Sequence, residues 1–221
     1  YEIAEKHDLK VNDMHEMDLI SFGAVRTENG YKGVPASYGY SDTMLLAAIT
    51  LDDYNKLTNK NEKLAENEIM VFGEDAPAGK IDLCGTKVYA KKHTEAFPKV
   101  SSNYGFDTEF AVVRDKELFD KLVSVNEEVY EENASQVSKQ FQFDLEGSNA
   151  SQMAFKDDML DKISKLFSDK SEKLAEEDQS APYTFSVPNR SAERAFALQM
   201  YGGLLFVGVY LGSIFIMGMA L

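Results

Sequence analysis

Short runs in which apolar and polar residues alternate recur along the first two thirds of this chain. Such alternation, with β-branched and aromatic residues prominent, is typical of strands with one face buried. Gly85 separates two of the runs, which are therefore expected to form a hairpin. A turn-rich stretch at residues 30–40 is expected to be a long loop. The predicted strands cover residues 18–25, 68–73, 80–83, 86–92, 108–113 and 139–145.

Helical spacing of apolar residues appears in three other places. Thr50 is the expected N-cap of a short helix over residues 51–57, and Asp115 of a helix that continues to Val125. Residues 126–138 are acidic and sparsely apolar, and they fit either a helix or a loop. A long amphipathic helix is predicted from residue 149 to about residue 177. Its apolar face carries Phe155, Met159, Ile163, Leu166 and Leu174.

The last stretch, residues 195–221, contains no Asp, Glu, Lys or Arg. Its apolar length exceeds the roughly 18 residues that mark a membrane-spanning helix. A buried core helix would show a polar face, and a secretory signal would lie at the N-terminus, so neither alternative fits. The sequence thus predicts an α+β domain of short strands and helices over residues 1–188 and one transmembrane helix over residues 189–221.

Glycines in the predicted membrane helix indicate packing against neighbouring helices, because small residues allow helix backbones to approach closely in a membrane. Gly208 and Gly212 form a GxxxG pair. The candidate helix-packing residues are Gly202, Gly203, Gly208 and Gly212.

The charge of the chain is strongly acidic, with a net charge of −14. This balance argues against nucleic acid as a partner, since nucleic-acid binders concentrate Lys and Arg on one face. Two interpretations stay open: the acidity attracts cationic partners, or it only keeps the domain soluble and away from anionic lipid headgroups. The single cysteine, Cys84, excludes an intrachain disulfide.

The sequence contains none of the common catalytic or metal-binding motifs. The three histidines, His7, His15 and His93, are far apart and lack the spacing that places two imidazoles on one helix face. Asp157, Asp158 and Asp161 are expected on the solvent-facing side of the long helix. We therefore expect no catalytic residue, no metal site and no cofactor. A membrane-tethered hydrolase that uses carboxylates is the enzymatic alternative.

Two stretches resemble a known family. ITLDDYNKLTNKNEKLAENEIMVFG (residues 49–73) is similar to the large extracellular domain of ABC transporter permeases of the bacitracin-export type, the BceAB-like systems of Gram-positive bacteria. RSAERAFALQMYGGLLFVGVYLGSIFIMGMAL (residues 190–221) looks like the eighth membrane helix of the same permeases, which belong to the FtsX-like superfamily.

This resemblance implies a segment of a larger permease, with the domain inserted between the seventh and eighth of ten membrane helices. The permease would reside in the cell membrane, with the domain on the extracellular side. Its partners would be a separate cytoplasmic ATPase subunit, to which ATP hydrolysis would belong, and in many systems a membrane sensor histidine kinase.

The implied function is antimicrobial peptide resistance. The domain would sense or bind cationic, cell-wall-directed peptides, or a peptide with its lipid-linked wall precursor. The alternative is an interaction domain of another FtsX-like permease, acting in lipoprotein transport or in cell-wall hydrolase regulation. The family offers no compact binding motif, so no individual ligand-binding residue carries over to this chain.

Overall fold

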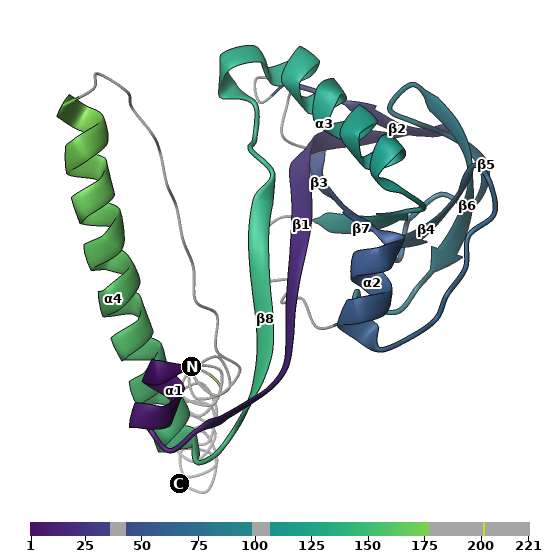
Figure 1. Cartoon of the computed structure of the whole chain (residues 1–221). Coiled ribbons are helices and arrows are strands. Elements are labelled where there is room, and N and C mark those ends of the chain that lie inside the picture. Colours follow the sequence, from purple (N-terminus) through teal and green to yellow (C-terminus); the bar gives the residue numbers. More distant parts are fainter. Residues whose placement is uncertain (36–42, 99–106, 177–200, 202–221) are drawn as a thin grey trace, which may run out of the picture. The chain divides into compact units, whose positions relative to one another are not determined.

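The computed structural model describes residues 1–35, 43–98, 107–176 and 201 (Figure 1). The chain divides into two compact units. Residues 13–143 form one, here called the sheet unit, and residues 1–12 together with the residues from 144 onward form the other, here called the terminal unit. The chain passes between the units twice, once within β1 and once within β8.

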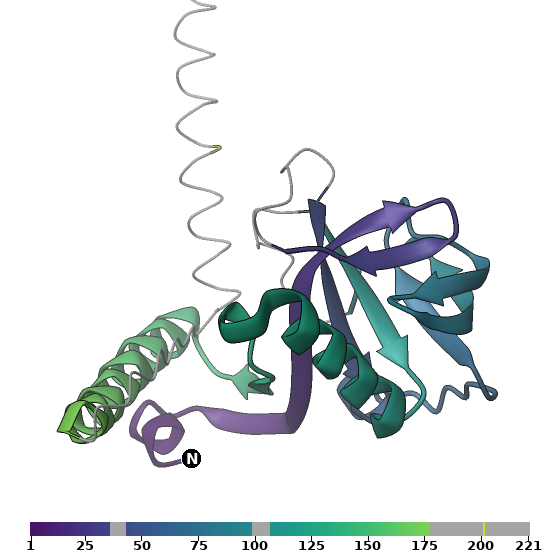
Figure 2. The ribbon, with the colours of Figure 1, turned by 90° about the horizontal axis from the view of Figure 1, so that it is seen from above.

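Most strands lie in the sheet unit and belong to a mixed sheet with the order β2-β5-β6-β4-β7-β3-β1-β8. Because β1 also pairs with β2, the first seven strands of this order form a closed ring of hydrogen-bonded neighbours. The hairpin of β1 and β2 that closes the ring is visible in Figure 2. The strands are β1 (Lys10–Thr27), β2 (Gly30–Gly33), β3 (Thr43–Thr50), β4 (Glu68–Phe72), β5 (Gly79–Leu83), β6 (Thr86–His93), β7 (Thr108–Val113) and β8 (Ser138–Glu146).

Two helices follow the central strands of the sheet, and both predicted N-caps are confirmed. The Thr50 hydroxyl accepts a hydrogen bond from the Asp53 N–H at 3.2 Å at the start of α2 (Leu51–Thr58). The Asp115 carboxylate accepts from the Leu118 N–H at 3.1 Å at the start of α3 (Lys116–Tyr130). α3 continues into the region that fitted either helix or loop, and a short 3-10 helix, η1 (Glu131–Asn133), follows it.

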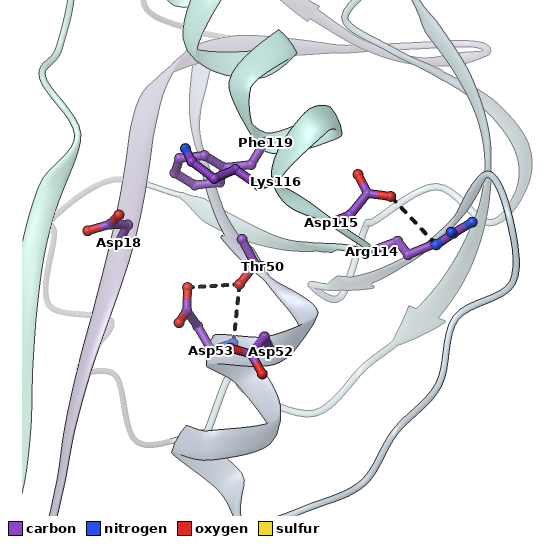
Figure 3. Close-up of a pocket in the computed structure, with 8 residues that line it drawn as sticks. All are labelled: Asp18, Thr50, Asp52, Asp53, Arg114, Asp115, Lys116 and Phe119. Carbon is purple, nitrogen blue, oxygen red and sulfur yellow. Dashed lines mark hydrogen bonds and ion pairs between the residues drawn. The ribbon is translucent and has the colours of Figure 1, made fainter.

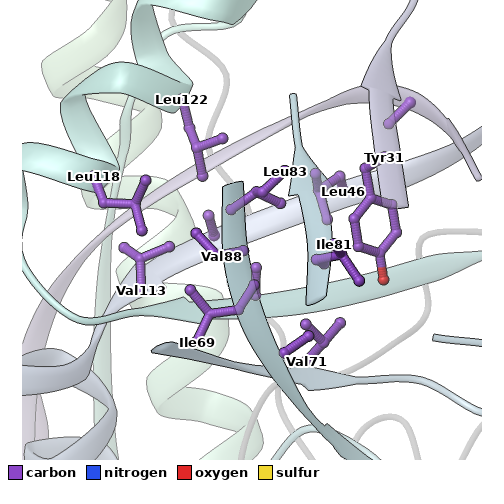
Figure 4. Packing of buried hydrophobic residues seen from close by; sticks show 14 of the residues in the cluster. Tyr31, Leu46, Ile69, Val71, Ile81, Leu83, Val88, Val113, Leu118 and Leu122 are labelled. Carbon is purple, nitrogen blue, oxygen red and sulfur yellow. The ribbon is translucent and has the colours of Figure 1, made fainter. Parts of the chain in front are cut away.

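Hydrophobic residues form a core on each face of the sheet. Along β7, Ala111 and Val113 belong to the core under α3, whereas Phe110 and Val112 belong to the core under α2. Figure 4 shows residues of the first core from α3 and from the surrounding strands. Since β3 and β7 are buried on both faces, their sequences read as nearly continuous apolar runs.

Two sequence-based expectations for the N-terminal part need correction. The stretch expected to be a long loop contains a strand, β2, which is only four residues long and has glycine at both ends. β1 begins at Lys10 and is much longer than the predicted strand over residues 18–25. No residue of β1 before Met17 is buried, so that part lacks the alternation that reveals a strand.

The terminal unit contains α1 (Glu2–Lys6) and α4 (Asn149–Glu176), and α4 matches the predicted long helix. Among the side chains of α4 that the structure describes, the apolar face is buried near the start of the helix and exposed further along: Phe155 is 6 % exposed, whereas Leu166 is 62 % exposed. Asp158, expected on the solvent-facing side, instead contacts the side chains of Lys6 and His7.

The predicted membrane segment lies almost entirely outside the described residues. Of the residues that are described, none belongs to a helix with both the length and the apolar character needed to span a membrane. The predicted packing residues Gly202, Gly203, Gly208 and Gly212 also lie outside the described part of the chain.

Candidate functional site

An open pocket lies in the sheet unit where the two central parallel strands end (Figure 3). β3 and β7 are parallel neighbours, and each leads directly into a helix. The carboxyl ends of both strands and the amino ends of α2 and α3 therefore meet at one edge of the sheet, where α/β proteins often bind ligands. The pocket has a volume of about 420 Å³. It is lined by Asp18, Thr50, Asp52, Asp53, Arg114, Asp115, Lys116 and Phe119.

The charge of this pocket is predominantly negative, because its lining has four carboxylates against two cations. One cation, Arg114, has its Nε atom 3.5 Å from Asp115 Oδ2, and the other, Lys116, lies over the Phe119 ring at 5.7 Å from the ring centroid. The partial positive charge at the two helix N-termini offsets some of the acidity. The pocket can therefore attract the ammonium or guanidinium group of a ligand.

Thr50 is fixed by the local backbone. Its hydroxyl donates a hydrogen bond to Asp53 Oδ2 at 2.8 Å while it accepts one from the Asp53 N–H. Burial raises the pKa of the Asp53 carboxyl, and the hydrogen bond from Thr50 opposes this effect. The lining contains no histidine or cysteine that could activate the Thr50 hydroxyl as a nucleophile. The carboxylates and cations of the lining can form hydrogen bonds and ion pairs with a polar ligand.

A second polar cluster lies at the opposite end of β7, where the strand begins. The Glu109 side chain is only 1 % exposed, and its Oε1 atom accepts a hydrogen bond from Arg26 Nε at 2.9 Å. Tyr31 donates a hydrogen bond to the other carboxylate oxygen of Glu109. Arg26 also contacts Asp107, with 2.5 Å between Nη2 and Oδ2. Gly73 makes room for Glu109, because a Cβ atom at Gly73 would lie 2.7 Å from Glu109 Cγ.

The polar groups of this cluster are paired with one another by hydrogen bonds and ion pairs. Burial raises the pKa of the Tyr31 hydroxyl well above its ordinary range, and its hydrogen bond to Glu109 adds to that effect. Desolvation alone would lower the pKa of Arg26, but hydrogen bonds to Asp107 and Glu109 outweigh it, so the pKa is raised. Among the described residues, no buried side-chain nitrogen or oxygen lacks a hydrogen-bond partner. We therefore interpret the cluster as a structural element and the open pocket as the candidate binding site.

No protein-family model matches this chain, and no curated protein is similar to it in sequence.

The histidines and the cysteine that sequence analysis considered lie apart from the pocket lining. His93 stacks on Phe72 with 4.6 Å between ring centroids, and its Nδ1 atom is 3.1 Å from Glu95 Oε1. Burial raises the pKa of the Cys84 thiol to about 11, so the thiol is unreactive near neutral pH. In the part of the chain that the structure describes, no group of three or more His, Cys, Asp or Glu residues is placed to hold a metal ion.

Neither polar site was predicted as a site from the sequence. The pocket brings together Asp18, Thr50 and Asp115, which are far apart in the chain and meet only through the pairing of β1, β3 and β7. The buried cluster had one visible signal, because Glu109 interrupts the otherwise apolar run of β7. A charged residue in a strand that is buried on both faces requires a partner, but the sequence does not reveal that this partner is Arg26.

Proposed function

We propose that this chain is the extracellular sensing and substrate-binding domain of an ABC transporter permease that confers resistance to cationic antimicrobial peptides. In this proposal residues 1–188 form the extracellular domain, and residues 189–221 form the membrane helix that follows it. The permease would work with a cytoplasmic ATPase subunit and with a membrane sensor histidine kinase. The resemblance of residues 49–73 and 190–221 to bacitracin-export permeases supports the assignment.

The observation that carries the proposal is the way the chain enters and leaves the sheet unit. The two ends of a domain inserted between two consecutive membrane helices must lie close together, because both continue into the membrane. Residues 1–12 and the residues from 144 onward belong to one compact unit, although they are distant in sequence. Ion pairs join them directly: Glu2 Oε2 lies 3.3 Å from Lys162 Nζ, and Lys6 Nζ lies 2.5 Å from Asp158 Oδ2.

The ligand side of the proposal rests on charge. A net charge of −14 attracts a cationic peptide over a distance, and the carboxylates of the pocket at the ends of β3 and β7 can pair with its cationic groups. If the peptide alters ATP binding in the partner subunit, ATP must alter peptide affinity by the same factor. A change in ATP affinity on adding peptide and a change in peptide affinity on adding ATP would therefore report the same coupling free energy.

Binding of a labelled cationic peptide such as nisin to the complete chain in detergent micelles tests the proposal. The pocket variant is Asp18→Asn with Asp52→Asn, which removes two carboxylates that do not cap a helix. The matched control is Glu127→Gln with Glu128→Gln, two exposed residues of α3 outside the pocket lining that give the same change in net charge.

Each partly exposed charge contributes about 0.2–1 kcal/mol, so the pocket variant should bind the peptide roughly two- to thirtyfold more weakly. The control should lose far less, and raising the salt concentration should weaken binding to all three proteins. The proposed recognition would be refuted if peptide affinity did not change with salt concentration, or if the pocket and control variants lost the same peptide affinity.

A further inference from the structure

α1 is too short to be stable on its own. It contains five residues, whereas isolated helices shorter than about 12–15 residues are marginal in water. Its backbone is closed by hydrogen bonds from the N–H of Glu5 to the carbonyl oxygen of Tyr1 at 3.0 Å and from the N–H of Leu9 to that of Ala4 at 2.9 Å. The helix ends at Lys6 with His7 as its C-cap, and Asp8 follows with φ +54°. Its stability must therefore come from the surface on which it rests.

That surface is provided by α4 and the residues just before it. Ala4 within α1 and Leu9 three residues after it are both buried, being 1 % and 6 % exposed. Leu9 packs on the backbone of Gly147, because a Cβ atom at Gly147 would lie 2.4 Å from Leu9 Cδ2. The apolar contact thus places α1 beside the start of α4.

Polar contacts around Asp158 of α4, here called the latch, hold α1 further. A single oxygen, Asp158 Oδ2, lies 2.5 Å from Lys6 Nζ and 2.8 Å from His7 Nε2. Glu2 and Lys162 join the other end of α1 to α4. The Lys6 and Asp158 side chains are 65 % and 34 % exposed, so water screens each pair and the latch can open.

We propose that α1 is a conditional helix, stabilised on α4 by the contacts of Asp158 with Lys6 and His7, and that its loss of order when these contacts break couples α4 to the start of β1. The chain passes from α1 into Lys10, the first residue of β1, after only three residues. A displacement of α4 that separates Asp158 from Lys6 and His7 therefore releases the segment that leads into the sheet. Transitions between order and disorder of this kind are a common switching device in proteins. The inference does not depend on what the sheet unit binds.

Amide hydrogen exchange of the complete chain in detergent micelles tests this inference without any ligand. The informative amides are Glu5, His7, Asp8 and Leu9, whose N–H groups donate the hydrogen bonds of α1 and its end. Asp158→Asn should accelerate their exchange roughly two- to thirtyfold, since two weak contacts are lost. Asp158→Glu keeps the carboxylate and should retain most of the protection.

The matched control is Asp157→Asn. Asp157 is the exposed neighbour on the same helix and forms no ion pair with a described residue. Raising the salt concentration of the unmodified protein should accelerate the same four amides, and this measurement requires no variant. The inference is overturned if the four amides exchange at the same rate in the Asp158→Asn and Asp157→Asn variants. It is also overturned if Asp158→Asn accelerates exchange of the amides of β3 and β7 as much as that of the amides of α1.

Discussion

Removal of the cation from the buried cluster should be costly, and Arg26→Met tests this. The substitution keeps a long apolar side chain but leaves the Glu109 carboxylate, 1 % exposed, without its positive partner. Breaking a buried ion pair in this way costs about 3–5 kcal/mol. Two features of the structure reduce the figure: the Arg26 side chain is 31 % exposed, and Tyr31 still donates a hydrogen bond to Glu109. We expect a loss of about 2–3 kcal/mol in the free energy of unfolding.

Urea unfolding of the sheet unit within the complete chain, followed by tyrosine fluorescence, measures this loss. Arg114→Met is the matched control, because Arg114 is 42 % exposed and its Nε atom lies 3.5 Å from the Asp115 carboxylate. An exposed pair of this kind contributes about 0–1 kcal/mol.

The double variant Arg26→Met with Glu109→Gln sharpens the test. A neutral amide does not need a cation, so the double variant should be more stable than the sum of the two single losses indicates. Equal losses for Arg26→Met and Arg114→Met, or losses that simply add in the double variant, would refute the interpretation of the cluster as a coupled network.

Two further predictions concern tyrosines of the sheet unit. The Tyr130 hydroxyl accepts a hydrogen bond from the Gly23 N–H at 2.8 Å, so Tyr130→Phe should lower the free energy of unfolding by about 1–2 kcal/mol; a loss below a few tenths, measured in the same urea assay, would show that water replaces the hydroxyl. Burial raises the pKa of Tyr31, so its contribution to stability is complete below the unfolded pKa near 10 and declines as the pH rises above that value. Tyr31→Phe should make the decline between about pH 10 and 11.5 shallower by up to about 1.4 kcal/mol per pH unit, and an unchanged slope would contradict this.

Local signals in the sequence were sufficient for much of the secondary structure. Thr50 and Asp115 mark the two helix starts because a capping residue acts only on amides two or three positions away. The run TEFAVV matches β7 at both ends because its flanks are polar. The long helix was recognised because its apolar spacing persists over many turns.

Features of the fold that depend on strands pairing across distant parts of the sequence were not predicted. β2 forms a local hairpin with β1, but its other neighbour is β5 from a distant part of the sequence, with Tyr31 paired to Leu83. No local pattern in the sequence indicates this second pairing, which the closed ring also requires. The same holds for the pocket, which requires that β3 and β7 be parallel neighbours although β4, β5 and β6 lie between them in the sequence.

The two polar ends of β7 should separate stability from binding. At its start, the Glu109 carboxylate is buried and engaged by Arg26 and Tyr31, so a change there alters the free energy of folding. Beyond the carboxyl ends of β3 and β7, Asp52 and Asp115 have side chains that are 75 % and 48 % exposed, so solvent already stabilises their charges and a ligand can still reach them. Arg26→Met should therefore lower stability with little effect on peptide affinity under native conditions, and the Asp18 and Asp52 substitutions should do the reverse. If one set of variants changed both quantities in parallel, the pocket and the cluster would have to act as a single site.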